Sequence, residues 1–365
     1  LSQVGCPMLE PISGVPVAWA LFSGGPTSTY ICQVLRGACV YFRRVPLQEP
    51  NLGPAGLVEK IQGRVPGILL YGIAPPKRDT LPTRLVEIAA QQRARLQQLQ
   101  PDGLIVYDIQ DESERTPEPR PFPFVRTLAP EQYAYETLAE LGLPKIVYRQ
   151  VTHGAPAEFR AFLERVRTRA EPSLSVLVGA PTRRTEQIQL RLSEAYALAR
   201  ESAFAEKLVL GGIAIAERHQ ARFDEHQKML AKSEQGVRFF VTQAVYDVAS
   251  SKSLLSDYAI ELSQREQAPV PVLLTFSPCG SEKTLAFMKW LGISIPRWLE
   301  NELRYSTDIL EQSVELCVQI FQELWLFARK KGIPLGANVE SVSIRKSEID
   351  ASVELFQRLR RIMRG

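Results

Sequence analysis

The sequence predicts an α/β protein built as a (β/α)8 (TIM) barrel over residues 57–365, with an N-terminal extension over residues 1–56. From Gly67 onward, short β-branched or aromatic runs alternate with stretches whose apolar residues recur at the helical period. Eight such units fill about 300 residues, and the strands are apolar on both faces, as in a closed parallel barrel. A doubly wound open sheet is the alternative, but no GxGxxG follows any strand.

The expected strands are short and are bounded by glycine, proline or charged residues. They are GILLYGI from Gly67, GLIVYDI from Gly103, PKIVYRQV from Pro144, LSVLVGA from Leu174, KLVLGGIAI from Lys207, RFFVTQAV from Arg238, PVPVLLTFS from Pro269 and GANVESVS from Gly336. Each is followed by a helical pattern, which is clearest over residues 81–100 and 307–331.

The extension falls outside this alternation. VAWALFSGGPTSTYICQVLRGACVYFRRV can be read as strand, glycine loop, helix and strand. Residues 23–28 resemble the phosphate loop SGGxDS of ATP pyrophosphatases, although Thr27 stands in place of the acid and the segment is too short for that domain. We favour the alternative of an incidental turn in an extension that packs on the barrel or is partly disordered.

Composition excludes several classes of protein. Lysine and arginine number 44 against 40 acidic residues, which is too balanced to indicate a nucleic-acid partner. The apolar runs have the length of strands, so we expect no membrane association. The apolar run near the N-terminus lacks the preceding basic region that a signal peptide has, so we do not expect it to be one. Five cysteines without CxxC spacing and three histidines indicate free thiols in a cytoplasmic protein, and we expect no metal site.

In a (β/α)8 barrel the site is built from the loops that follow the strands. The informative residues there are Gly72, Lys77, Arg78, Tyr107, Asp108, Gln110, Asp111, Glu112, Arg149, His153, Ala180, Arg183, Glu217, Arg218, His219, Gln243, Tyr246, Asp247, Ser277 and Glu340. The loop QDESERTPEPRPFPFVRTLAP is long, proline-stiffened and carries two phenylalanines, so we expect an ordered lid. Its acidic residues either take part in catalysis or are solvated and paired with Arg115 and Arg120.

Two stretches carry a resemblance to a known family. GGIAIAERHQARFDEHQKMLAKSEQGVRFFVTQAVYD, residues 211–247, and VPVLLTFSPCGSEKTLAFMKWLGISIPRWLENEL, residues 270–303, resemble methylenetetrahydrofolate reductase. The resemblance covers roughly residues 57–365 and is specific in the second half but loose in the first. It implies a barrel flavoprotein of one-carbon metabolism that moves a hydride from NAD(P)H through FAD to methylenetetrahydrofolate.

The resemblance also implies roles for single residues. Gln243, within Thr-Gln, matches the family's folate-contacting glutamine, and His219 and Lys232 match flavin-side contacts. We expect Tyr107 and Arg149 to join Gln243 in substrate binding, because the strand ends of a barrel surround one common space. The expected partner is a folate-like small molecule, and we expect a homo-oligomer.

The sequence departs from the family at two strand ends. The family's first strand ends Glu-Phe-Phe-Pro-Pro, where the glutamate donates a proton to the substrate, and aligning the prolines places Gly72 at that position. The fourth strand of the family reads Leu-Arg-Gly-Asp-Pro, whereas this chain has Val178 for the arginine and Ala180 for the aspartate. We therefore expect FAD binding to be weak or absent.

Three hypotheses follow. The first is an active NAD(P)H-dependent, folate-linked oxidoreductase with a relocated acid. Asp108 and Glu217 are the candidates for that acid, Glu340 is another nearby carboxylate and Tyr107 is a weaker candidate. The second is a non-catalytic folate- or flavin-binding protein. The third is an enzyme of different chemistry, since a fold does not determine a function.

Overall fold

The computed structural model describes the backbone of residues 18–23, 29–35 and 38–40, and residues 56–112, 116–152, 154–179 and 188–365 in full. The chain divides into two units, Leu1–Pro54 and Ala55–Gly365. In the first, β1 (Ala18–Ser23), β2 (Thr29–Leu35) and β3 (Ala38–Val40) form an antiparallel sheet. The helix read after the glycine loop is wrong, because TYICQVL is rich in strand-forming residues and pairs with β1. Residues 24–28 of that loop lie outside the described part.

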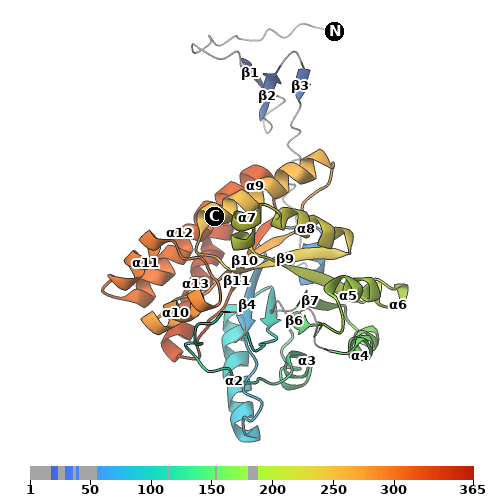
Figure 1. The fold of residues 1–365 in the computed structure, drawn as a ribbon, viewed down its shortest axis with the longest axis vertical. Helices are drawn as coiled ribbons and strands as arrows, with labels where there is room; N and C mark the ends of the chain where they lie inside the picture. The colour runs from blue at the N-terminus through green and yellow to red at the C-terminus, as the bar shows by residue number, and fades with distance from the viewer. Residues whose placement is uncertain are drawn as a thin grey trace. The chain divides into compact units, whose positions relative to one another are not determined.

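The second unit is a closed, all-parallel, eight-stranded barrel, so the predicted (β/α)8 fold is confirmed (Figure 1). The strand order around the barrel is β10-β11-β4-β5-β6-β7-β8-β9. The strands are β4 (Leu69–Ile73), β5 (Gly103–Val106), β6 (Lys145–Gln150), β7 (Ser173–Val178), β8 (Leu208–Ala214), β9 (Val237–Ala244), β10 (Val272–Phe276) and β11 (Leu335–Val339). Each overlaps the stretch that the alternation of apolar runs predicts.

Helices surround the barrel on its outer side (Figure 1). They are α1 (Leu57–Gln62), α2 (Pro82–Leu99), α3 (Pro130–Gln132) with the π-helix η1 (Tyr133–Thr137), α4 (Pro156–Arg167), α5 (Leu192–Ala199), α6 (Ser202–Ala205), α7 (Ala216–Arg222), α8 (Glu225–Glu234), α9 (Val248–Gln264), α10 (Glu282–Trp290), α11 (Arg297–Arg304), α12 (Ile309–Lys331) and α13 (Lys346–Arg364). None of the helices in the described segments combines the length and apolar character that crossing a bilayer requires.

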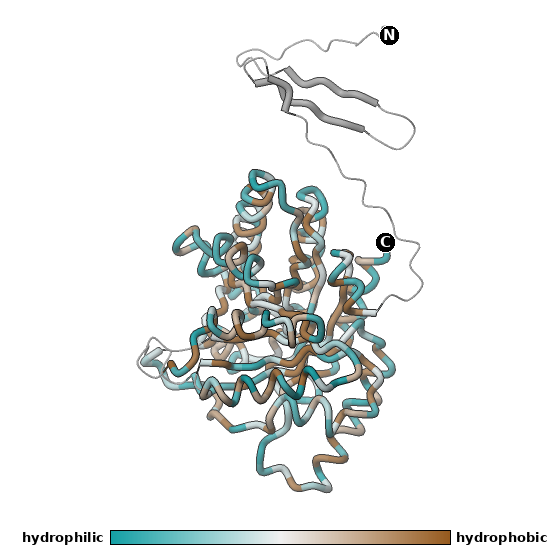
Figure 2. Tube along the Cα trace, turned by 90° about the vertical axis from the view of Figure 1, so that its right-hand side faces the viewer, coloured by the Kyte–Doolittle hydropathy of each residue, from teal (hydrophilic) through white to brown (hydrophobic). Residues whose placement is uncertain are grey.

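Two apolar clusters form the core. The larger lies between strands and helices, and the smaller fills the barrel interior with residues such as Leu70, Ile105 and Val241. Figure 2 shows hydrophobic residues gathered in the central strands and hydrophilic residues recurring along the outer helices. Because side chains alternate along a strand, the interior cluster identifies which residues at the carboxyl ends of the strands, here called the barrel mouth, face inward.

Candidate functional site

Inward-facing polar residues meet at the barrel mouth around Gly72. We call Tyr107, Tyr148, Asn338 and Glu340 the mouth cluster. The Asn338 amide donates a hydrogen bond to the Tyr107 hydroxyl at 2.8 Å, and the Tyr107 and Tyr148 rings meet edge to face at 4.8 Å. The Tyr107 hydroxyl also lies within hydrogen-bonding reach of the Glu340 carboxylate. Residues at the carboxyl ends of β5, β6 and β11 thus form one connected polar group beside Gly72 of β4.

The mouth cluster holds a carboxyl that titrates near neutral pH. Burial raises the pKa of Glu340 from 4.5 to about 7, and the hydrogen bond from Tyr107 acts in the opposite direction. Burial and the neighbouring Glu340 charge raise the pKa of Tyr107 well above its ordinary value, so this tyrosine stays protonated. A carboxyl with a pKa near the working pH can both give and accept a proton, which is what general acid–base chemistry requires.

Tyr107 fills the space in which a side chain at position 72 would begin. A Cβ added to Gly72 would lie 2.9 Å from Tyr107 Cε2, 3.0 Å from its hydroxyl oxygen and 3.2 Å from Asn338 Oδ1. The first two distances are at or below the closest approach that such atoms tolerate. The absence of a carboxyl at position 72 is therefore matched by an aromatic ring that packs against the glycine.

Asp108, one of the two predicted catalytic residues, has both carboxylate oxygens in hydrogen bonds. The Gln110 side chain donates to one oxygen at 2.6 Å, and the backbone N–H of Gln150 donates to the other at 2.8 Å. Burial raises the pKa of Asp108, but these two donors favour its ionised form. Asp108 thereby joins the end of β5 to β6, and it is less free than Glu340 to transfer a proton.

Arg149 does not face the mouth, so the expectation that it joins Tyr107 there is wrong. Tyr148 belongs to the barrel interior, and the next residue along β6 therefore points outward toward the helices. The Arg149 guanidinium lies over the Phe162 ring of α4 at 4.6 Å and is 4.0 Å from the Glu131 carboxylate. Its surroundings indicate a role in attaching α4 to the barrel.

Glu217 and Gln243 lie at the same end of the barrel and contact one segment. Glu217 accepts a hydrogen bond from the Ser294 N–H at 3.3 Å, and the Gln243 amide donates to the Leu291 carbonyl at 2.7 Å. Both partners belong to the connection between α10 and α11. Burial raises the pKa of Glu217, and the Asp247 charge adds to that shift while the Ser294 hydrogen bond opposes it.

Two amide oxygens at the barrel mouth lack hydrogen-bond donors. Gln243 Oε1, near the end of β9, and Asn338 Oδ1, in β11, are buried and have no partner among the described residues. Gln243 lies two residues beyond the inward-facing Val241, so the alternation places it on the inner face. A buried acceptor without a donor costs about 1–3 kcal/mol, and a ligand that carries N–H groups would remove that cost.

The long loop after β5 packs against α10 through residues between Glu118 and Phe124. Arg120 lies over the rings of Phe124, Phe287 and Trp290 at 5.4, 5.3 and 5.1 Å, and Phe122 meets Phe287 edge to face. The Trp290 indole N–H donates to the Glu118 carbonyl at 3.0 Å. Burial lowers the pKa of Arg120, while Asp111 and Glu112 raise it. Arg115 lies outside the described residues.

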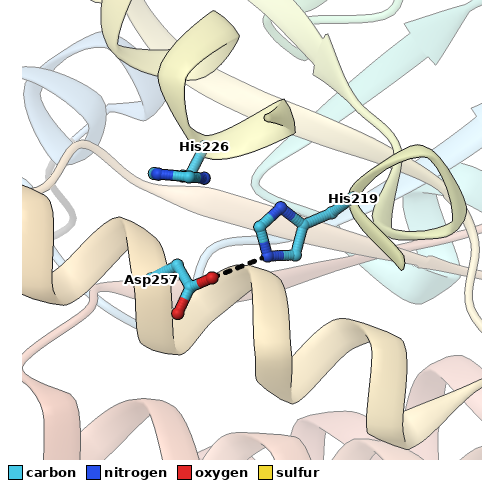
Figure 3. Close-up of side chains that lie close together, drawn as sticks. All are labelled: His219, His226 and Asp257. Carbon is cyan, nitrogen blue, oxygen red and sulfur yellow. Dashed lines mark hydrogen bonds and ion pairs between the residues drawn. The ribbon is translucent and has the colours of Figure 1, made fainter. Parts of the chain in front are cut away.

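His219 and Lys232, which the resemblance assigns to flavin contacts, both have hydrogen-bond partners within the protein. His219 is buried and its Nε2 lies 3.0 Å from Asp257 Oδ2 of α9, because α7 begins directly after β8 and turns this side chain toward α9 (Figure 3). The Lys232 ammonium donates to the Ile213 carbonyl at 2.6 Å, and burial lowers its pKa. Val178 supplies no charge. His153, Ala180 and Arg183 lie outside the described residues.

Sequence reasoning missed Asn338 altogether and named Glu340 only as a nearby carboxylate. A usable signal exists in the run Asn338-Val339-Glu340, since two polar residues that alternate with a buried valine at the end of the last strand share the inner face. The local pattern does not show which distant residues bond the side chains of Asn338 and Glu340. Tyr107 lies 231 positions away along the chain from Asn338.

Comparison with known proteins places the chain within a group. No family model and no curated protein matches the sequence. An uncharacterised protein of known structure from Clostridium thermocellum binds two copies of 5-methyl-5,6,7,8-tetrahydrofolic acid. It is 42% identical to this chain, and the match has a TM-score of 0.73 and covers 84% of this chain and 99% of that one. Dihydropteroate synthase from Xanthomonas albilineans, at 15% identity, 82% and 95% coverage and a TM-score of 0.40, is too distant to bear on function. Given the identity over nearly the whole Clostridium thermocellum protein, this chain belongs to the same family of (β/α)8 barrel proteins.

Proposed function

We propose that this protein binds a reduced folate carrying a one-carbon unit at the barrel mouth. The observation that carries the proposal is the pair of buried, unpartnered amide oxygens of Gln243 and Asn338 at the carboxyl ends of β9 and β11. The pterin ring of a tetrahydrofolate presents N–H donors along its edge, which is the complement that such acceptors need. The relative that binds 5-methyltetrahydrofolate supports the choice of ligand class.

Binding is tested by anaerobic titration calorimetry with 5-methyltetrahydrofolate. Gln243→Leu removes one hydrogen-bond acceptor that the protein offers to the ligand. The variant should bind the ligand about 10- to 100-fold more weakly, the equivalent of about 1.4–2.8 kcal/mol. Gln319→Leu is the matched control, because this glutamine is exposed on α12 and its side chain donates a hydrogen bond to Glu315 of the same helix. A parent protein that fails to bind at millimolar ligand, or a Gln243→Leu variant that binds as the parent does, overturns the proposal.

A second function, catalysis on the bound one-carbon unit, is favoured by one specific observation. Glu340 combines a pKa of about 7 with a place in the cluster that closes on Gly72, so it is suited to donate a proton near where the reductase glutamate would act. We propose Glu340, rather than Asp108 or Glu217, as the acid of an NAD(P)H-dependent, reductase-like reaction. The engagement of His219 and Lys232 supports weak or absent flavin binding, which predicts a colourless purified protein.

The catalytic proposal is tested by following NAD(P)H consumption with methylenetetrahydrofolate. Glu340→Gln should lower turnover by about 10²- to 10⁴-fold while leaving folate affinity within a few-fold of the parent, because only proton transfer is removed. Asp108→Asn serves as the comparison and should have the smaller effect on turnover. An active parent that is insensitive to Glu340→Gln contradicts this assignment, and an inactive parent that still binds folate leaves binding as the function.

A further inference from the structure

A group of three metal-ligand side chains lies among the outer helices, away from the mouth cluster. His219 of α7, His226 of α8 and Asp257 of α9 converge on one point between these helices (Figure 3). One ring nitrogen of each histidine and one carboxylate oxygen all lie within 4.8 Å of one another. His219 is fully buried and His226 is 8% exposed, whereas the Asp257 side chain is 42% exposed.

Hydrogen bonds among the described residues leave one buried ring nitrogen of each histidine without a partner. His219 Nε2 is paired with Asp257 at 3.0 Å, but Nδ1 of His219 and Nδ1 of His226 are buried and have no partner among the described residues. The two rings meet edge to face, with centroids 5.2 Å apart. Buried ring nitrogens are rarely left without a partner, so this geometry points to a missing electron-pair acceptor or a missing donor.

The turn that brings the histidines together is strained. Phe223 ends α7 with a φ of 55°, in the left-handed region that a bulky residue occupies only at a cost of about 1–3 kcal/mol. This turn reverses the chain so that α8 returns His226 to His219. Strain of this kind persists where surrounding contacts compensate for it, and a shared ligand on the two histidines is one such contact.

We propose that His219, His226 and Asp257 bind a divalent transition-metal ion of the zinc class, with water in the fourth position on the exposed side. Two imidazoles and a carboxylate form a ligand set that suits Zn²⁺. Metal–ligand distances of about 2.0–2.2 Å place tetrahedral ligand atoms about 3.3–3.6 Å apart, so small side-chain rotations suffice. The ion would tie α7 and α8, which follow β8, to α9, which follows β9. Glu217 lies on α7 and Gln243 on β9.

The test uses the full chain, stripped with a chelator and then titrated. Zn²⁺ followed by calorimetry should bind at one equivalent and raise the unfolding temperature, because an ion that binds only the folded state stabilises it. Co²⁺ should give the visible absorption of a low-coordinate site. His226→Gln and Asp257→Asn should each weaken binding by at least about 100-fold, since even partners outside the ligand set cost about 10- to 100-fold.

Glu261→Gln is the matched control and should leave binding unchanged. This carboxylate lies one turn further along α9 and is held by Arg265. The proposal is overturned if the folded parent binds neither Zn²⁺ nor Co²⁺, a result that does not depend on any variant. It is also overturned if both ligand variants remain folded by circular dichroism and bind Zn²⁺ as tightly as the parent.

Discussion

The raised pKa of Glu340 makes the stability of the barrel depend on pH in a defined direction. The folded-state pKa of about 7 exceeds the ordinary value of 4.5, so the folded state binds this proton more tightly than the unfolded state does. The resulting stabilisation is complete below pH 4.5 and is lost as the pH rises through 7. At about 1.4 kcal/mol for each pKa unit, the loss approaches about 3 kcal/mol, an upper limit because solvent screens a partly exposed side chain.

Glu340→Gln should remove this dependence, because the amide stays neutral throughout. We expect the free energy of unfolding of the variant, relative to the parent, to rise between pH 5 and pH 8 by about 1–3 kcal/mol. Urea unfolding at four pH values measures it in the absence of folate. If the free energies of unfolding of variant and parent differ by the same amount at every pH, the difference reflects only the altered contact with Tyr107. That result would refute the reasoning.

Glu315→Gln provides a control of the opposite sign. The Arg358 guanidinium holds the pKa of the Glu315 carboxyl below its usual range, so the stabilisation from Glu315 is present above the ordinary pKa and is lost in acid. This variant should therefore lose stability relative to the parent at neutral pH and approach it at low pH. If the stabilities of Glu340→Gln and Glu315→Gln, each relative to the parent, change in opposite directions with pH, each variant reports the titration of its own carboxyl.

Two further predictions concern the packing of the mouth and the lid. Gly72→Ala should destabilise the barrel by about 1–3 kcal/mol, because the new Cβ would lie 2.9 Å from the Tyr107 ring. Gly142→Ala is the control and should leave stability unchanged, because a Cβ there has nothing within 4 Å. Equal urea midpoints for the two variants would contradict this prediction. Arg120→Met removes three cation–π contacts, each worth about 0.5–2 kcal/mol. Limited proteolysis within residues 116–128 should therefore be faster in the variant than in the parent. An unchanged cleavage rate would count against the packing of this loop on Trp290.

The barrel could be predicted from the sequence because its signal is local and repeated. Each strand is a short run that is buried on both faces, and each long helix, such as α2 or α12, shows its own apolar period. The extension carried a weaker signal. A glycine turn followed by TYICQVL is compatible with a phosphate loop and helix or with a hairpin, and strand propensity together with pairing to β1 decides for the hairpin.

The candidate site was predicted only in part, because residue spacing does not reveal which way a side chain turns. The strand-end rule located Tyr107 and Gln243 at the mouth, but Arg149 differs from Tyr148 by one position and so faces the opposite side of β6. The pairing of His219 with Asp257 joins residues 38 positions apart on different helices. A search for cysteine and histidine spacing along the chain does not reveal such an arrangement.

The contact between Gly72 and Tyr107 also means that a side chain at position 72 and the tyrosine ring compete for the same space. With tyrosine at position 107, any side chain that enters at position 72 meets the ring at its first carbon, so Gly72→Glu places a strained residue in the mouth instead of a working acid. A smaller residue at position 107 would open this space, but it would also remove the hydroxyl that pairs with Asn338 and Glu340. A carboxyl on β4 and the intact mouth cluster are therefore alternative occupants of the same volume.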